Sequence, residues 1–240
     1  TQPLIDRYEA DPNAIRPASA YNEVMSFLRG GLVDISMSRS SVDWGIPLSW
    51  DESQVVYVWF DALLNYITAV GYGADPASSE AQLFERVWPA NVQLVGKDIL
   101  RFHAVYWPAM LMAAGLQPPK QVFAHGWLLV GGEKMSKTKL TGIAPELIID
   151  HFGSDGFRYY FMAAIAFGND GSFSWEDMSA RYTAELANGL GNLASRATAM
   201  VGKYFEGSLP AAGPISDAEN TIHALLAKTV TDADACVGEL

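Results

Sequence analysis

Strands and helices alternate through the middle of this 240-residue sequence, and that alternation restricts the fold more than any other feature. The consecutive β-branched and aromatic residues of 54–59 predict a strand buried on both faces. Shorter apolar runs predict further strands at 91–95 and 121–124, and helices are predicted between the strands, over 61–70 and 98–114. This order is typical of a parallel sheet covered by helices, so we expect an α/β fold here.

The second half of the chain has a different, helical pattern. A short helix is predicted from Pro145, and residues 168–171 are predicted to form a linker. Ser174 then opens a capping box, because the acidic residue Asp177 stands three positions later. A long helical stretch follows, and another helix is predicted from Asp217. We therefore expect an α/β part followed by an all-helical part.

Composition limits the class of protein. With 50% hydrophobic and 18% charged residues, the sequence supports a buried core and excludes a disordered chain. The longest nearly apolar run, residues 105–116, is shorter than the roughly 20 residues that span a bilayer, so no membrane partner is expected. The single cysteine, Cys236, excludes an internal disulfide framework and fits a reducing compartment, for which we expect the cytoplasm.

A cluster of lysines contrasts with the acidic composition. The net charge of −11 argues against a nonspecific nucleic-acid binder, because phosphate contacts need Lys and Arg. Yet Lys134, Lys137 and Lys139 follow a glycine pair closely, and the hydroxyl of Ser136 stands between the first two. A loop after the third strand would lie at the carboxyl edge of the sheet, where open α/β sheets bind ligands. These lysines predict an anion site; the alternative is a solvated hairpin tip.

Three other patterns are set aside. Residues 189–194 match the dinucleotide fingerprint G-x-G-x-x-A, but a helix and not a strand is predicted before them. Residues 136–139 match S-x-x-K without the partner motifs of the penicillin-recognising hydrolases. His103, His125 and His151 lack the spacing of metal ligands, so no structural metal is predicted in this chain.

The lysine loop resembles the KMSKS signature of class I aminoacyl-tRNA synthetases, since residues 134–138 read KMSKT and threonine keeps the final hydroxyl. Further segments stand in the order expected of the methionyl-tRNA synthetase family. They are residues 34–39, 43–45, 57–62, 96–103, 107–109, 125–127 and 191–196. The resemblance extends over residues 20–205.

The resemblance implies a Rossmann-like fold and four parts. Residues 1–50 would be the tail of an inserted connective region, and 51–139 the second half of the catalytic domain with its KMSKS loop. Residues 140–172 would form a stem-contact and linker region, and 173–240 the start of the helical anticodon-binding domain. The family's HIGH motif does not occur in this sequence, so we expect it, with a zinc-bearing knuckle, in a segment upstream.

Roles in ATP binding and catalysis follow from the same resemblance. The residues implied to bind ATP are Gly96, Asp98, His125, Gly126 and Lys137. Lys134, Ser136 and Lys137 are implied to stabilise the pyrophosphate leaving group. Magnesium is expected to enter bound to the phosphates of ATP.

The resemblance also implies a methionine pocket and an anticodon contact. The pocket residues are Trp59, Leu63, Tyr66, His103 and Arg39, of which Leu63 stands where the family often has proline. Aromatic faces suit a thioether, which is polarizable and a poor hydrogen-bond acceptor. Asn192 and Arg196, one helical turn apart, are implied to read the anticodon.

The implied reaction is ATP-dependent activation of L-methionine to methionyl-adenylate, followed by transfer to tRNA(Met). We expect the isolated chain not to form the adenylate, because the HIGH-containing half of the ATP site lies outside it. The alternative is a noncatalytic, synthetase-like module that binds tRNA. An upstream HIGH motif in the parent gene would separate the two.

Overall fold

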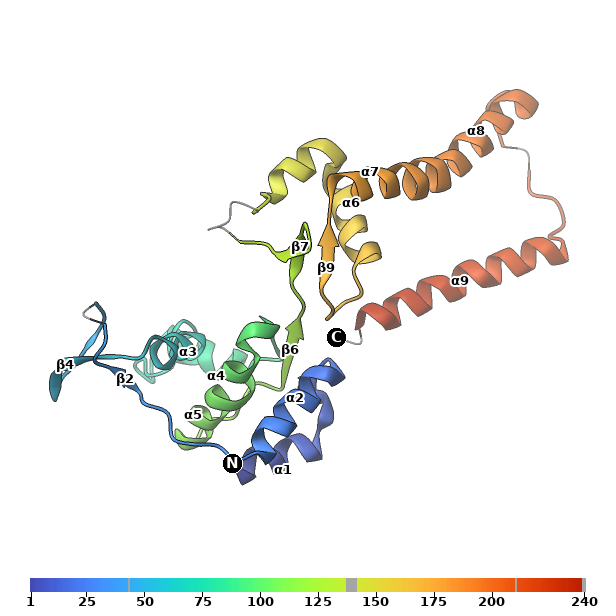
Figure 1. Ribbon diagram of the computed structural model, residues 1–240. Coiled ribbons are helices and arrows are strands. Elements are labelled where there is room, and N and C mark those ends of the chain that lie inside the picture. Colours follow the sequence, from blue (N-terminus) through green and yellow to red (C-terminus); the bar gives the residue numbers. More distant parts are fainter. Residues whose placement is uncertain (43, 137–141, 210, 239–240) are drawn as a thin grey trace. The chain divides into compact units, whose positions relative to one another are not determined.

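The computed structural model describes residues 1–42, 44–136, 142–209 and 211–238 (Figure 1). The chain forms two compact units, described here one at a time. Unit 1 comprises Thr1–Leu129 and Ala166–Gly171, and unit 2 comprises Val130–Ile165 and Ser172–Leu240. The domain roles expected for the four parts of the sequence stay predictions.

Unit 1 contains most of the strands. Its elements up to β4 are α1 (Gln2–Ala10), η1 (Pro12–Ala14), β1 (Ile15–Arg16), α2 (Ala18–Arg29), β2 (Ser38–Arg39), β3 (Pro47–Leu48) and β4 (Asp51–Val56). They are followed by α3 (Val58–Thr68), α4 (Ser79–Val87), β5 (Val92–Gly96), η2 (Lys97–Ile99), the π-helix η3 (Phe102–Tyr106), α5 (Trp107–Ala113) and β6 (Gln121–His125).

A parallel sheet with the strand order β1-β6-β5 lies at the centre of unit 1. Leu94 pairs with Phe123 and Gly96 with His125, so β5 and β6 end side by side. Helices α1 and α2 supply much of the buried core against this sheet, and the Tyr8 hydroxyl donates to the carbonyl of Ala104. The expected α/β fold with a parallel sheet is confirmed.

The first predicted strand does not belong to this sheet. β4 pairs antiparallel with β2 and β3 in a separate sheet of order β2-β4-β3. Within β4 only Val55 is classed as buried, so the prediction of a strand buried on both faces is wrong, and the chain is already helical from Val58. The short β3–β4 connection, in which Leu48 pairs with Asp51, makes the antiparallel hairpin partner available locally. The third parallel strand is β1, whose two residues carry no strand pattern of their own.

The predicted helix over 98–114 forms in three pieces, η2, η3 and α5, and ends as expected before Gly115, whose φ is +73°. Its middle piece is a π-helical turn, a local feature frequent at functional sites. A second core cluster forms where α3 faces α5, from Leu63, Ile67, Trp107 and Leu111.

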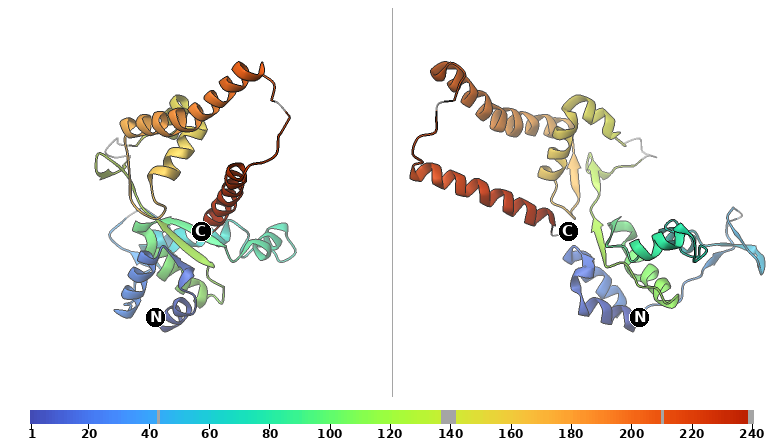
Figure 2. Two further views of the ribbon diagram at one scale, coloured as in Figure 1. Left: turned by 90° about the vertical axis from the view of Figure 1, so that its right-hand side faces the viewer. Right: turned by 180° about the vertical axis from the view of Figure 1, so that it is seen from behind.

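Unit 2 is mainly helical. Its elements are β8 (Glu133–Lys134), α6 (Pro145–Ala164), α7 (Trp175–Arg181), the π-helix η4 (Tyr182–Gly191), α8 (Asn192–Phe205) and α9 (Asp217–Gly238). The chain passes between the units three times: within β7 (Leu128–Val130), between Ile165 and Ala166, and within β9 (Gly171–Phe173). Figure 2 shows α7, η4 and α8 following one another without a break, and α9 as a separate helix after a loop.

The helix signals of the second half are confirmed. α6 begins at Pro145, and Gly153, with φ of +73°, divides it into two helical pieces. The Ser174 hydroxyl accepts from the backbone N–H of Asp177 at 3.1 Å, which is the predicted cap. α9 begins at Asp217.

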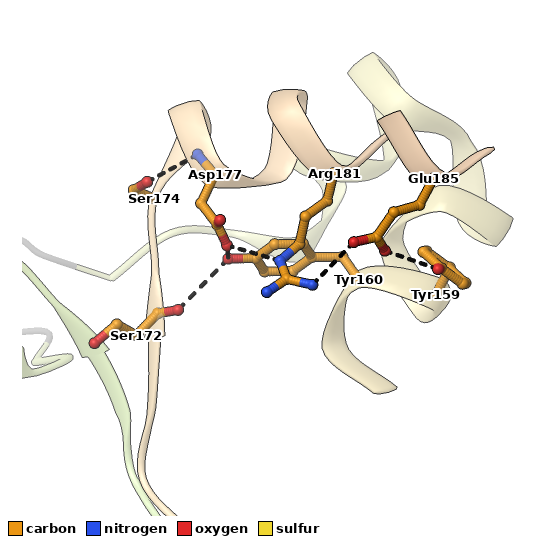
Figure 3. Close-up of polar contacts among 7 residues, drawn as sticks. All are labelled: Tyr159, Tyr160, Ser172, Ser174, Asp177, Arg181 and Glu185. Carbon is orange, nitrogen blue, oxygen red and sulfur yellow. Dashed lines mark hydrogen bonds and ion pairs between the residues drawn. The ribbon is translucent and has the colours of Figure 1, made fainter. Parts of the chain in front are cut away.

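A polar network joins α6 to α7 and η4 within unit 2 (Figure 3). The buried Tyr160 hydroxyl donates to Asp177 at 2.8 Å, and Arg181 contacts the same carboxylate at 3.3 Å. Arg181 also pairs with Glu185 at 3.2 Å, and Glu185 accepts from the Tyr159 hydroxyl at 2.8 Å. The helices that lead to α8 are therefore held to α6 by directed bonds.

Replacing Tyr160 with phenylalanine is expected to lower the free energy of unfolding of this helical unit by about 1.5–3 kcal/mol at neutral pH, the range for a hydrogen bond to a charged group. Burial, with the hydrogen bond to Asp177, raises the pKa of Tyr160 from 10.0 to about 12. The Tyr160 hydrogen bond therefore contributes fully to the free energy of unfolding below pH 10.0, and this contribution is lost as the pH rises to about 12. Urea denaturation at neutral and alkaline pH measures both effects. Tyr204→Phe, at a residue that is 60% exposed on α8, is the control, and equal losses in the two variants would contradict the assignment.

Candidate active site

Aromatic rings from α3 and η3 form a compact wall in unit 1. The rings of Trp59 and Phe102 are stacked, with centroids 4.2 Å apart and planes 13° from parallel. His103 meets the edge of Trp59 at 6.4 Å and that of Tyr66 at 5.5 Å. Leu63, one turn after Trp59 on α3, is buried beneath them. The structure thus brings together four of the five residues predicted for a methionine pocket.

His103 is held in one tautomer by hydrogen bonds at both ring nitrogens. Nδ1 lies 2.9 Å from the carbonyl oxygen of Ile99 and Nε2 lies 2.9 Å from the hydroxyl of Tyr66. A carbonyl only accepts, so Nδ1 carries the proton and Nε2 accepts from Tyr66. Burial lowers the pKa of His103 more than the Ile99 bond raises it, and burial raises the pKa of Tyr66. The wall is therefore uncharged at neutral pH.

The space beside this wall is small. The cavity next to the Trp59–Phe102 stack measures about 10 Å³, which is room for about one water molecule. Its lining includes Trp59 and Leu63 of the predicted methionine pocket, together with Tyr57.

Arg39, the fifth predicted pocket residue, lies on the neighbouring β2-β4-β3 sheet. Its guanidinium stands 3.6 Å above the Tyr57 ring and donates to the carbonyls of Ser36 and Ser38, at 3.1 and 2.9 Å. It lines a pocket of about 700 Å³ together with Trp44. Tyr57 borders both this pocket and the small cavity at the aromatic wall, so the Tyr57 side chain separates Arg39 from the wall.

The residues predicted to bind the nucleoside of ATP gather where β5 and β6 end. Gly96 and His125 are paired across the two strands. A Cβ at Gly96 would lie 2.7 Å from a carboxylate oxygen of Asp98, and a Cβ at Gly126 would lie 2.1 Å from the carbonyl oxygen of Asn169. Neither glycine can carry a side chain without displacing its neighbour. The two glycines therefore let the carboxyl edge of the parallel sheet pack closely against Asp98 and Asn169, at the edge where open α/β sheets bind ligands.

Three further residues complete this edge and were missed by sequence reasoning. Lys97 forms an ion pair with Asp170, Nζ to Oδ2 at 2.7 Å, and stands 4.2 Å from the Trp127 ring. The other oxygen of Asp170 accepts from the backbone N–H of Trp127 at 2.8 Å. The hydrogen bonds from Lys97 and from Trp127 lower the pKa of Asp170. Asp170 lies in the predicted linker 168–171, and no local pattern marks it.

The predicted lysine loop is described only in part. Lys134 lies in β8, after the turn in which Gly131 and Gly132 have positive φ, and Ser136 follows it. Lys137 lies outside the described residues. Asn192 and Arg196, the predicted anticodon residues, are both exposed on the first turns of α8.

No group of three or more His, Cys, Asp or Glu side chains among the described residues is arranged to hold a metal ion. None of the helices in the same part of the chain is both long and apolar enough to cross a membrane.

Comparison with known proteins identifies the family. The family described as tRNA synthetases class I (M) matches residues 2–198. The chain belongs to this family. The KMSKT loop, the aromatic wall and the edge formed by β5 and β6 all lie within the matched part.

Relatives within the family are methionine–tRNA ligases. The ligase of Streptomyces coelicolor is 60% identical over 239 residues, which are 100% of this chain and 44% of that protein. The ligase of Clostridium tetani is 55% identical over 209 residues, 87% of this chain and 32% of that protein. This chain therefore spans less than half the length of these relatives.

Solved structures agree with the fold. The methionyl-tRNA synthetase of Mycobacterium tuberculosis in complex with methionyl-adenylate superimposes with a TM-score of 0.81 at 44% identity, covering 98% of this chain and 46% of that one. The apo form of the same enzyme gives a TM-score of 0.77 at 42% identity, with coverage of 98% and 45%. The roles of individual residues stay predictions at this point.

Proposed function

We propose that this chain is part of a methionyl-tRNA synthetase, in which it contributes to the ATP-dependent activation of L-methionine and to its transfer to tRNA(Met). The observation that carries the proposal is one short segment, residues 96–103. It begins with Gly96 and Asp98 at the edge where β5 and β6 end, and it finishes with His103 in the aromatic wall. A nucleoside site and an apolar side-chain site are thereby joined, as methionyl-adenylate requires. One relative, the methionyl-tRNA synthetase of Mycobacterium tuberculosis, binds that compound in two solved structures.

In the activation step, the carboxylate of methionine attacks the α-phosphorus of ATP, the bond to the β-phosphate oxygen breaks, and pyrophosphate leaves. ATP enters as its Mg²⁺ complex. Positioning and electrostatic stabilisation then supply most of the acceleration. Asp98 accepts from the ribose hydroxyls, Gly96 lets the backbone approach the ribose, and His125 and Gly126 lie at the adenine side. Lys134 and Lys137 neutralise the charge that develops on pyrophosphate, and the Ser136 hydroxyl donates a hydrogen bond to it.

The uncharged wall selects the amino acid. Trp59, Tyr66 and His103 present ring faces and edges to the thioether, which suits its polarizable sulfur. A neutral His103, fixed between Ile99 and Tyr66, places no charge against an apolar side chain. Arg39 stacks on Tyr57, which separates it from the wall, and Leu63 lies in the buried cluster against which Trp59 packs.

A chimera tests the proposal directly. This chain replaces the matching segment of the Streptomyces coelicolor ligase, to which it is 60% identical. We expect methionine-dependent exchange of pyrophosphate into ATP at a rate comparable with that of the parent enzyme. A soluble, folded chimera that binds tRNA(Met) but shows no exchange would favour the noncatalytic tRNA-binding module instead.

Replacing Arg196 with alanine in the chimera is expected to weaken tRNA(Met) charging by about 1–3 kcal/mol, the cost of one directed base contact. Arg196 and Asn192 are exposed one turn apart on α8, and an acidic chain offers few other cations for RNA. The KM for tRNA(Met) is measured beside exchange without tRNA, which should stay normal. Loss of exchange would mean that Arg196 supports the fold, and unchanged charging would mean that it is ordinary helix surface.

We also infer that the protein works in the cytoplasm. The lone Cys236 is exposed and free, which fits a reducing compartment, and the proposed tRNA substrate is found there.

A further inference from the structure

We propose that Asp170 is a positioning residue for the nucleotide, which sets the spacing between the ends of β5 and β6 through Lys97 and Trp127. This inference rests on the proposed function and adds to it a residue from a distant part of the sequence. Asp170 and Lys97 are 73 positions apart, yet their side chains meet at 2.7 Å.

The segment that carries Asp170 is fastened to β6 and to the residues that follow it. The rings of Phe167 and Phe123 are stacked at 4.3 Å. The backbone N–H of Gly171 donates to the carbonyl of Trp127 at 2.9 Å, and Asp170 accepts from the N–H of the same residue at 2.8 Å. Both backbone polar groups of Trp127 are thus bonded to one segment. The main chain after β6 has little freedom to move independently of Asp170.

The second carboxylate oxygen of Asp170 reaches the other strand. Lys97 stands between Gly96 and Asp98, the two residues predicted to hold the ribose, and its ammonium is bonded to Asp170 and lies 4.2 Å from the Trp127 ring. The Trp127 indole N–H in turn lies 3.5 Å from the carboxylate of Asp98. One carboxylate therefore connects the end of β5 to the end of β6.

Stability alone does not account for this arrangement. The Lys97 and Asp170 side chains are 40% and 33% exposed, and ion pairs of that exposure contribute little to the free energy of unfolding. What the pair does determine is geometry at an edge where Gly126 already contacts Asn169 too closely to accept a Cβ. Loss of the charge of Asp170 or of Lys97 should therefore change the affinity for the nucleotide more than it changes the free energy of unfolding.

The experiment uses pyrophosphate exchange by the chimera, with D170N, K97M, the double variant, and the conservative K97R. D170N is expected to raise the KM for ATP about tenfold through misplacement of the edge, with the KM for methionine within about twofold of the starting value. K97M should match D170N, the double variant should be no worse than either single one, and K97R should recover most of the affinity. E9Q is the control, since Glu9 pairs with Arg29 on α1 and α2, away from the edge.

The outcomes separate the inference from the proposed function. Exchange activity with an unchanged KM for ATP in D170N contradicts the role of Asp170 alone. Effects of K97M and D170N that multiply in the double variant also contradict it, because Lys97 would then contact ATP itself. Equal increases in the KM for ATP and the KM for methionine would contradict a role specific to the nucleotide, because they would indicate that the substitution disturbs the fold. The amide NMR spectrum of each variant tests the fold independently. A chimera without any exchange contradicts the proposed function, and the role of Asp170 with it.

Discussion

Replacing Lys137 with alanine in the chimeric synthetase is expected to raise the barrier to adenylate formation by about 2–4 kcal/mol, the loss seen when one preorganised electrostatic donor is removed. Lys137 is the second lysine of the KMSKT loop, and its charge is needed only as negative charge develops on the leaving pyrophosphate. The affinity for methionine should therefore stay nearly constant while the rate falls.

Pre-steady-state measurement of adenylate formation separates these two quantities. Lys228→Ala removes the same charge from α9, where Lys228 pairs with Asp232, and should leave the rate unchanged. If the Lys137 variant activates methionine normally but binds it weakly, the loop has been assigned the wrong role.

The second large effect is expected at Leu63. Its side chain is 2% exposed and packs in the cluster with Ile67, Trp107 and Leu111. Leu63→Ala removes buried methyl groups and leaves a cavity, so the free energy of unfolding should fall by about 2–5 kcal/mol. Urea denaturation followed by tryptophan fluorescence measures the loss.

The next residue provides a matched control. Leu64 is 36% exposed on the same helix, and Leu64→Ala should change the free energy of unfolding by less than about 0.5 kcal/mol. Equal losses at the two positions would show that the cluster is not the core of this region. Leu63→Met, which nearly conserves volume, should restore most of the stability and keep the support of Trp59 on the same helix.

The sequence predicted some parts of the methionine pocket better than others. Trp59, Tyr66 and His103 were predicted together, and their rings do meet at one wall. The stacking of Trp59 on Phe102, with ring centroids 4.2 Å apart, was not predictable, because it depends on how α3 packs against the π-helical turn η3. Arg39 was predicted beside them but is separated from the wall by Tyr57, since β2 belongs to a different sheet.

The amino-acid sequence by itself determined the features that depend on neighbouring residues. The cap at Ser174, the helix end at Gly115 and the helix starts at Pro145 and Asp217 each follow from a local backbone requirement. The family, too, follows from short segments in a fixed order, because each segment carries its chemistry in adjacent positions.

The tertiary structure alone decided which distant segments meet. β4 has a strong strand pattern, yet the parallel sheet takes β1 as its third strand, because a strand's residues encode burial and extension but not a partner. Asp170 stands in a stretch that predicts only a linker, and it acquires its contacts when Phe167 and Gly171 fasten that stretch to β6 and Trp127. Ion pairs and strand pairings of this kind depend on distance in space, for which spacing in the sequence offers no signal.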